Sequence, residues 1–329
     1  MTQATGEDEA AMARALDLAA GVRTSTSPNP WVGTVVVTPD GTYAGATEPP
    51  GGRHAEIVAL QAAGAAAKGA TLATTLEPCS HTGRTGPCTD AIIAAGIARV
   101  VVAIEDPDPQ VAGQGFARLE AAGIEVVDGV LADEVRTQLA PYLIHRTTGR
   151  PYVVLKLAAT LDGRTAAPDG TSQWITGVAA RTDAHRLRAE SDAVVVGAGT
   201  VRSDDPRLTV RHGNGSDPLR VVLGHAPEGA KVQPALELQG DLGQVLDELG
   251  QRGVLQALVE GGAAVAHDFH AAGLIDRYVL YLAPALFGGD DARGLFAGPG
   301  APTIDDIWRG RIVSTTPLGD DLRIDVEAA

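Results

Sequence analysis

The sequence predicts an α/β protein made of two different domains. Short apolar runs rich in valine alternate along the chain with alanine-rich stretches of helical period, which is the pattern of α/β proteins. The 329 residues correspond to about two domains at roughly 150 residues each. A polar stretch, HRTTGRP at 145–151, separates two series of such runs, so we place the domains at 1–148 and 149–329. Because no segment repeats at a fixed period, the halves are not a duplication.

The first series begins with GTVVVT at 33–38, a β-branched run that predicts a strand. The segments that follow are a helix from His54 (HAEIVALQAAGAAAKG), a strand at 70–78 (ATLATTLEP), a helix from Cys88 (CTDAIIAAG) and a strand at 99–107 (RVVVAIEDP). Gly64, Gly69 and Gly96 lie where helices should end, because glycine readily adopts the left-handed conformation found at helix C-termini.

The second series contains five runs that predict strands. They are PYVVLKLA at 151–158, DAVVVGAG at 192–199, LRVVLG at 219–224, VLQALVEGG at 254–262 and DRYVLYLAP at 276–284. Helical or loop segments such as VAARTDAHRLRAES at 178–191 separate them.

Charge and composition exclude several classes of protein. Lys and Arg (26) against Asp and Glu (41) give a net charge of −15, which disfavours a general binder of nucleic acid or of anionic membranes. An anionic substrate must therefore meet cations that are gathered locally. The first twenty residues are acidic and lack the basic and apolar regions of a signal peptide, and the apolar runs are shorter than the ~20 residues of a membrane helix. We expect a cytoplasmic protein that does not bind membranes.

The most informative pattern joins His54-Ala55-Glu56 with the only two cysteines, Cys79 and Cys88. Each cysteine follows a proline, and the two lie where a predicted strand passes into a predicted helix. One imidazole and two thiolates suit a tetrahedral Zn²⁺ whose fourth position holds water, and such a metal lowers the pKa of that water toward ~7. Glu56 lies two residues from the ligand histidine, near enough to move a proton from this water to a departing amine.

Each of these residues alone favours a simpler interpretation. Cys79 and Cys88 could be small buried residues or form a disulfide, and His54 could be an ordinary residue at a helix N-terminus. Together they favour zinc. H-x-E followed by P-C-x-x-C is the signature of zinc nucleobase deaminases, but here eight residues separate the cysteines, so the nucleic-acid editors with short spacing fit less well.

The second half has neither cysteine nor H-x-E. GAGTVR at 197–202 begins like a dinucleotide fingerprint but ends in arginine, which weakens a Rossmann interpretation. Gly261-Gly262, after a predicted strand, would let main-chain N–H groups approach a phosphate at a helix N-terminus, and a plain turn explains these glycines equally well.

A group of cations in the second half is more suggestive. It comprises Lys156, Arg188, Arg207 and Arg211. The planar guanidinium group suits a sugar phosphate, although surface arginines are usually only solvated.

The chain resembles a known family over residues 12–326. LEPCSHTGRTGPCTDAIIAAG, with RHAE before it and EDPDPQVAGQG after it, resembles the deaminase domain of the bifunctional riboflavin-biosynthesis deaminase-reductases. LKLAATLDGRTA, SQWITG, ARTDAHRLRAESDAVVVGAGTVRSDDPRLTVR and VEGGAAVAHDF resemble their reductase domain, which is similar in fold to dihydrofolate reductase. The resemblance implies a cytidine-deaminase-like α/β/α zinc domain followed by a dihydrofolate-reductase-like domain.

In the first domain the resemblance implies that Asn29 contacts a pyrimidine. It also implies that the residues around the substrate are His81, Arg84, Asp106 and Asp108. Without the family, Arg84 would be a solvated cation, and the two aspartates would be turn formers before proline.

Two positions depart from the family pattern. Gly86 stands where proline is common, and Thr47 stands where many members have a histidine that contacts phosphate. A different group, or a hydrogen bond from the threonine hydroxyl, must replace that histidine.

In the second domain the resemblance implies a substrate site and a site for NADPH. The substrate residues are Lys156, Ser172, Trp174, Arg188, Asp204, Arg207, Arg211 and Glu260. Arg207 is included because it belongs to the group of cations, and the resemblance implies the others. The residues expected near NADPH are Ala158, Thr200, Gly261 and Gly262. Trp174 could equally be a core residue, and Asp162-Gly163 favours a turn over a catalytic acid.

The implied reactions are two. Zinc-dependent hydrolysis removes the 2-amino group of 2,5-diamino-6-(ribosylamino)pyrimidinone 5′-phosphate, and NADPH then reduces the sugar at C1′ to give the ribitylamino uracil phosphate. We expect a small phosphorylated pyrimidine as partner, no nucleic acid, and a homo-oligomer, either a dimer or a tetramer. The alternatives are a nucleic-acid or nucleoside deaminase with an accessory nucleotide-binding domain, and a non-catalytic zinc module fused to a phosphosugar-binding domain.

Overall fold

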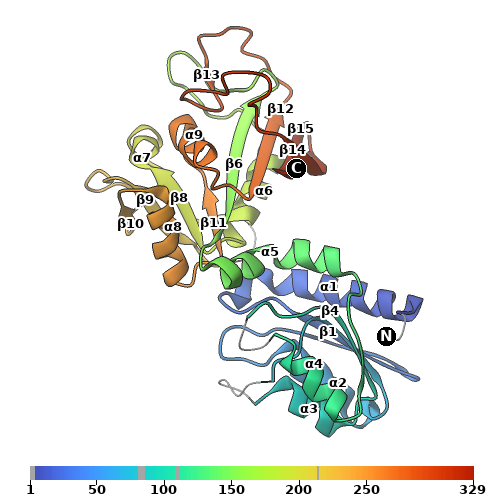
Figure 1. Ribbon diagram of the computed structural model, residues 1–329. Coiled ribbons are helices and arrows are strands. Elements are labelled where there is room, and N and C mark those ends of the chain that lie inside the picture. The colour runs from blue at the N-terminus through green and yellow to red at the C-terminus, as the bar shows by residue number, and fades with distance from the viewer. Residues whose placement is uncertain (1–3, 81–85, 109–111, 213–214) are drawn as a thin grey trace. The chain divides into compact units, whose positions relative to one another are not determined.

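A computed structural model describes residues 4–80, 86–108, 112–212 and 215–329. The chain forms two compact units, Met1–Thr148 and Gly149–Ala329 (Figure 1). Both units are α/β, which confirms the predicted fold class. No helix in the described ranges combines the length and the apolar character needed to cross a membrane.

The first unit is built around a five-stranded sheet with the order β2-β1-β3-β4-β5. Its strands are β1 (Gly33–Thr38), β2 (Gly41–Ala46), β3 (Thr71–Leu76), β4 (Arg99–Ile104) and β5 (Glu125–Val127). Its helices are α1 (Gly6–Thr26), α2 (Ala55–Ala63), α3 (Cys88–Ala95), α4 (Gln114–Ala121) and α5 (Ala132–Thr148), with a 3₁₀ turn η1 (Gly64–Ala67). β1 is antiparallel to β2 and β3, whereas β3, β4 and β5 are parallel.

Helices cover both faces of this sheet, which gives the three-layer arrangement visible in Figure 1. On one face Leu72 packs with Ile92 of α3 and Leu119 of α4. On the other face α1 lies so close to β1 that a Cβ at Gly33 would be 1.9 Å from the carbonyl oxygen of Ala15. Because β3 and β4 are central, both are buried on their two faces, as their continuous apolar runs indicate.

The second unit is built around an eight-stranded sheet with the order β10-β9-β8-β11-β6-β12-β15-β14. Its strands are β6 (Tyr152–Thr160), β8 (Ala193–Gly197), β9 (Leu219–Leu223), β10 (Leu236–Leu238), β11 (Gln256–Val259), β12 (Arg277–Ala283), β14 (Gly310–Leu318) and β15 (Asp321–Ala328), and a separate ladder joins β7 (Arg164–Ala166) to β13 (Arg293–Gly294). Its helices are α6 (Val178–Ala189), α7 (Ala198–Asp204), α8 (Leu242–Gln251) and α9 (Ala263–Ala271).

The strands from β10 to β12 run parallel, and β15 is antiparallel to both β12 and β14. All five predicted strands of this half are present. The run at 192–199 is shorter than predicted, because the strand ends at Gly197 and the next residues begin α7. The segment at 178–191 contains the helix α6, which ends at Ala189. β6, β8 and β11 are neighbours, so the residues that follow their carboxyl ends meet at one edge of the sheet.

Candidate functional site

Three elements of the first unit bring His54, Cys79 and Cys88 together. His54 is the N-cap of α2, Cys79 follows β3 and Cys88 begins α3. The His54 Nδ1 atom lies 3.6 Å from the Cys79 Sγ atom and 3.3 Å from the Cys88 Sγ atom, and all three ligand atoms lie within 4.8 Å of one another. In a tetrahedral zinc site the nitrogen-to-sulfur separation is roughly 3.5 Å, given the usual Zn–N and Zn–S bond lengths. The donors therefore fit zinc in both type and spacing.

The main chain holds the two cysteines at this spacing. The carbonyl oxygen of Cys79 accepts the N–H of Thr89 at 3.2 Å and its hydroxyl at 3.3 Å. The N–H of Cys88 points to the Cys79 Sγ atom at 3.4 Å. Both cysteines are free, so the structure does not support the disulfide alternative.

The two neighbouring cysteines shift each other's pKa in opposite directions. The hydrogen bond from the Cys88 thiol, together with His54, lowers the pKa of Cys79 to about 4. The same hydrogen bond raises the pKa of Cys88. A divalent cation bound here would favour the thiolate form of both cysteines.

Glu56 lies in the first turn of α2 and is 4% exposed. Burial, and then the nearby charge of Cys79, raises the pKa of Glu56 to about 7. A carboxyl group with this pKa beside a metal site can both take and give a proton at neutral pH.

The other predicted deaminase residues are described only in part. Asn29 is half-buried between α1 and β1, and Asp108 lies in a bend after β4. Asp106 is buried, and its carboxylate accepts the N–H of Asp108 at 2.9 Å and the hydroxyl of Tyr142 at 3.1 Å. The predictions for His81 and Arg84 lie outside the described residues.

Thr47 does not offer its hydroxyl to a ligand. The hydroxyl accepts the N–H of Val32 at 3.0 Å and lies 3.4 Å from the carbonyl oxygen of the same residue. Thr47 is also buried. Of the two alternatives for the family histidine, the structure therefore disfavours the threonine hydroxyl, because the main chain of Val32 already binds it, and favours a different group.

In the second unit a buried carboxylate gathers two of the predicted cations. Glu260 follows β11 and accepts two hydrogen bonds from Arg188 of α6, at 2.5 and 2.8 Å. The Nζ atom of Lys156 lies 3.5 Å from the same carboxylate. Burial alone would raise the pKa of Glu260, but the charges of Arg188 and Lys156 lower it to about 2. The three residues thus form one ionised cluster.

The segment that carries Arg211 is joined to this cluster through α6. A third donor of Arg188 reaches the carbonyl oxygen of Thr209 at 3.3 Å. The Nδ1 atom of His185, one turn earlier in α6, accepts the main-chain N–H of Arg211 at 3.3 Å. Burial, and then the charges of Arg188 and Arg211, lower the pKa of His185 to about 4. His185 is therefore a neutral acceptor at pH 7.

This low pKa predicts a specific pH dependence of stability. The unfolded chain protonates His185 near pH 6.5, whereas the folded chain does so only near pH 4. The free energy of unfolding should therefore fall as the pH drops from 6.5 toward 4, by up to about 1.4 kcal/mol per pH unit from this residue, and should not depend on it above pH 6.5. Urea unfolding across this range should show a smaller slope for His185→Gln. Equal slopes would contradict the assignment.

The remaining predicted substrate residues lie on loops. Trp174 is 68% exposed, with the guanidinium group of Arg181 4.7 Å from its ring centre, so the alternative that it belongs to the core is wrong. Ser172 lies on the same loop and is half-buried. Asp204 ends α7, and both Asp204 and Arg207 are exposed.

Asp162 and Gly163 form a turn, as predicted. The Asp162 carboxylate accepts the hydroxyl of Thr160 at 2.5 Å and the N–H of Gly288 at 2.8 Å. Gly163 has the positive φ of 73° that such a turn requires.

The residues expected near NADPH lie where β6, β8 and β11 end or approach their ends. Ala158 lies two residues after Lys156 on the same face of β6, opposite the core residues of that strand. The hydroxyl of Thr200, in α7, accepts the N–H of Gly262 at 3.2 Å. A Cβ at Gly261 would lie 2.5 Å from the side chain of Val265, so this turn needs glycine.

Two well-placed residues were missed by the sequence analysis. His185 is three residues before Arg188, a spacing that puts both on one helix face. Glu77 directly precedes Pro78 and Cys79 and is buried. The position of Glu77 next to a metal ligand could have marked it as a candidate from the sequence. The hydrogen-bond partners of Glu77 and His185 can be identified only in the folded structure.

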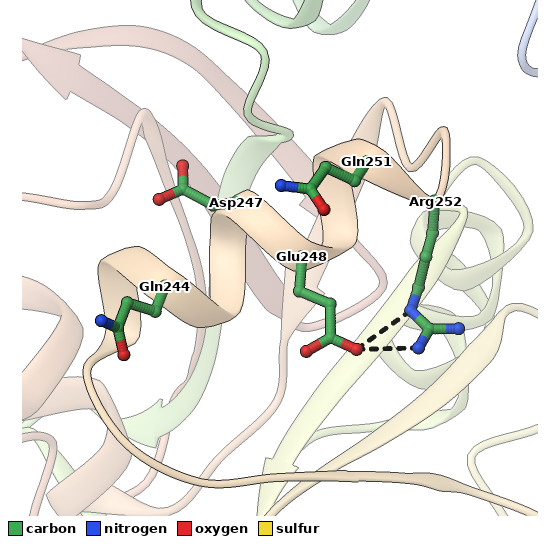
Figure 2. Close-up of a pocket in the computed structure, with 5 residues that line it drawn as sticks. All are labelled: Gln244, Asp247, Glu248, Gln251 and Arg252. Atoms are coloured by element: carbon green, nitrogen blue, oxygen red, sulfur yellow. Dashed lines mark hydrogen bonds and ion pairs between the residues drawn. The ribbon is translucent and has the colours of Figure 1, made fainter.

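A hollow on the outer face of α8 holds none of these residues. Figure 2 shows its lining, which consists of Gln244, Asp247, Glu248, Gln251 and Arg252. Glu248 and Arg252 form an ion pair at 2.7 Å, one helical turn apart. This is an ordinary solvated helix face, and we assign it no chemistry.

Two family models match the chain. The cytidine and deoxycytidylate deaminase zinc-binding region matches residues 5–104, and the RibD C-terminal domain matches residues 151–324. The first match covers His54, Cys79 and Cys88, and the second covers Lys156, Arg188 and Glu260.

Several proteins match this chain over nearly their whole length. The riboflavin biosynthesis protein RibD of Mycobacterium tuberculosis is 42% identical, with 97% of this chain and 96% of that protein covered. RibD of Escherichia coli is 40% identical, with 96% and 98% covered. The solved structure of Acinetobacter baumannii RibD matches with a TM-score of 0.92 at 38% identity, covering 98% of this chain and 99% of that chain. A diaminohydroxyphosphoribosylaminopyrimidine deaminase/5-amino-6-(5-phosphoribosylamino)uracil reductase of Thermotoga maritima matches with a TM-score of 0.88 at 32% identity and the same coverage.

Proposed function

The chain belongs to the RibD family, which joins a deaminase and a reductase of riboflavin biosynthesis in one polypeptide, and from this premise we propose how its residues divide the two reactions. The observation that carries the proposal is the convergence of His54, Cys79 and Cys88, with buried Glu56 beside them. A nucleic-acid deaminase and a non-catalytic zinc module, the two alternatives from the sequence, do not agree with this family.

The first unit removes the 2-amino group of 2,5-diamino-6-(ribosylamino)pyrimidinone 5′-phosphate by hydrolysis. His54, Cys79 and Cys88 hold zinc, which when bound lowers the pKa of a coordinated water to about 7 and so supplies hydroxide. The Glu56 carboxylate would take one proton from the water and give it to the ring nitrogen as hydroxide adds to the ring carbon. It would then move the proton of the added hydroxyl group to the 2-amino group, which leaves as ammonia while the carbonyl forms. Its burial keeps competing water away from this proton transfer.

The pyrimidine is held by residues around this point. Asn29 contacts the ring, and Asp106 and Asp108, together with His81 and Arg84, surround the substrate. The carboxylate of Asp106 is oriented for this task by its hydrogen bonds to the Asp108 N–H and to a tyrosine hydroxyl. Because the Thr47 hydroxyl is engaged, the phosphate contact falls to another group.

The second unit reduces the sugar of the deaminated product. After the sugar ring opens to the imine, NADPH would supply the hydride for C1′ while the imine nitrogen takes a proton. Ala158, Thr200 and the Gly261-Gly262 turn would hold the cofactor. The N-terminus of α9, which follows Gly262, offers main-chain N–H groups to a cofactor phosphate.

The cations of this unit hold the sugar phosphate. Arg188 uses three donors on protein acceptors and so mainly fixes Glu260. Lys156 and the exposed Arg211 are freer to meet the ligand, and Arg207 adds positive charge beside Arg211. Ser172, Trp174 and Asp204 complete the substrate site from the loops before α6 and at the end of α7.

A coupled assay tests both halves of this assignment. The diamino substrate should release ammonia without NADPH, and NADPH oxidation should begin only after deamination. Ammonia release with no NADPH oxidation, even on adding the deaminated substrate, would contradict the reductase assignment.

Loss of one zinc ligand should empty the metal site without unfolding the second unit. Wild-type protein should contain about one equivalent of zinc, and Cys79→Ser should lose most of it, because an alcohol replaces a thiolate ligand. Deamination should be lost and reduction of the deaminated substrate kept. Elemental analysis that finds unchanged zinc in the variant would contradict the ligand assignment.

A homo-oligomer formed through the sheet edge of the second unit is also part of the proposal. β14 is one of the two edge strands of the sheet, nine residues long and exposed along most of its length, with Ile312 60% exposed. Trp308 and Ile304, in the segment before β14, are exposed too. A long exposed edge strand that carries apolar side chains such as Ile312 favours pairing with a second copy. Ile312→Lys should shift the mass measured by light scattering toward the monomer, and an unchanged mass would argue against this interface.

A further inference from the structure

We infer that Glu77 is a positioning residue of the deaminase site, which fixes the segment that carries Asp106 against the segment that carries the ligand Cys79. Glu77 directly follows β3, and only Pro78 separates it from Cys79. This inference rests on the proposed deaminase function, since it assigns the residue to the geometry of that site. Its effect passes through the main chain that its side chain holds.

The Glu77 side chain is bound on both of its oxygen atoms. Glu77 is 3% exposed, and its carboxylate accepts four main-chain N–H groups. The Oε2 atom accepts those of Asp106 at 3.2 Å and Gly113 at 3.0 Å. The Oε1 atom accepts those of Gly115 at 2.8 Å and Phe116 at 3.4 Å. One side chain thus joins the end of β4 and the start of α4 to the segment after β3.

Gly115 shows how closely these segments approach. A Cβ at this position would lie 2.3 Å from the carbonyl oxygen of Pro78 and 2.9 Å from the Glu77 Oε1 atom. The main chain of α4 therefore rests directly on the residue that precedes the ligand Cys79. A change at either Glu77 or Gly115 disturbs the same contact from opposite sides.

Glu77 also acts on the proposed substrate contacts, because it binds the main chain of Asp106. Glu77 holds the Asp106 N–H, while the Asp106 carboxylate is oriented by Tyr142 and Asp108. Displacement of this main chain would therefore move a proposed substrate contact together with a metal ligand. Replacing a hydrogen-bond partner of a metal ligand commonly changes metal affinity about 10- to 100-fold, and Glu77 acts on Cys79 through the main chain that joins them.

Glu77→Gln and Gly115→Ala, made in the full chain, test the inference. Glutamine keeps the size of the side chain but turns an NH₂ group toward N–H donors, which leaves donors unpaired. We expect the zinc affinity, measured by competition with a chromophoric chelator, to fall about 10- to 100-fold in both variants. The thiolate charge-transfer bands of the Co²⁺-substituted proteins should shift, and KM for deamination should rise as kcat falls. Reduction of the deaminated substrate should stay within about 2-fold, since the second unit keeps its own fold.

Asp8→Asn is the matched control. Asp8 is another buried carboxylate of the first unit, which caps α1 at Thr5 and binds Arg99. It should lower stability and leave the zinc affinity and the Co²⁺ spectrum unchanged. Unchanged zinc affinity and spectrum in Glu77→Gln and Gly115→Ala, or failure of both to fold while the control folds, would assign Glu77 to stability alone. Wild-type protein that binds no zinc, or that releases no ammonia, would instead contradict the proposed function.

Discussion

Glu56→Gln is expected to lower the rate of deamination at least about 10²- to 10⁴-fold while leaving reduction of the deaminated substrate unchanged. Glutamine has nearly the same shape as glutamate, but it cannot take a proton from water and pass it to the ring and the leaving ammonia. Burial gives Glu56 a pKa of about 7, so the native residue is suited to both transfers at neutral pH. Ammonia release and NADPH oxidation, measured separately on the same preparation, give the two rates.

Zinc content and a second variant make this result specific. Glu56→Gln should keep about one equivalent of zinc, because Glu56 is not needed as a ligand. Glu120→Gln, an exposed change on α4, removes the same charge and should leave both rates near those of the wild type. Ammonia release by Glu56→Gln at a rate near the wild type would show that another group moves the proton.

The zinc site could be predicted from sequence because its chemistry is local. His54 and Glu56 are two residues apart, and Cys79 and Cys88 each begin a segment whose start is marked by proline. The ligand atoms lie within 4.8 Å of one another because β3 and the N-termini of α2 and α3 meet at one point. The types of the ligand residues restrict the choice of metal, and the order of strands and helices brings these residues together.

Other parts of the fold gave weaker signals. α1 buries a face made mostly of small residues, Ala11, Met12, Ala15 and Ala19, so it shows little contrast between its apolar and polar faces. β14 is exposed on both sides and lacks the alternation that identifies a half-buried strand. Such elements are decided by tertiary packing, which single-sequence patterns do not contain.

Thr47 and His185 show that sequence patterns also do not reveal which partner a polar side chain binds. A threonine at the place of a family histidine allows a hydroxyl contact with substrate, but the fold pairs this hydroxyl with Val32. From the sequence, His185 in an arginine-rich helix would be taken for a further cation, but burial beside Arg188 lowers its pKa and keeps it neutral. Whether a polar group faces a ligand or the protein depends on contacts between residues far apart in the sequence.

Arg188→Met should abolish most of the reduction and destabilise the second unit. Removal of the guanidinium group leaves the buried carboxylate of Glu260 with only Lys156, at 3.5 Å. Breaking one side of a buried ion pair costs about 3–5 kcal/mol, because the remaining charge is uncompensated. We expect a loss near the lower end, about 3 kcal/mol, since Lys156 stays. Urea unfolding of the full chain and NADPH oxidation with deaminated substrate measure the two effects.

Loss of function and loss of stability can be separated at this pair. The double variant Arg188→Met/Glu260→Gln removes the orphaned charge as well, so it should regain most of the stability but not the reduction. Arg186→Met, on the same helix, breaks two ion pairs whose arginine is about half exposed, and should cost at most about 1 kcal/mol without affecting reduction. If the double variant recovered NADPH oxidation together with stability, Arg188 and Glu260 would serve only the fold and would not belong to the substrate site.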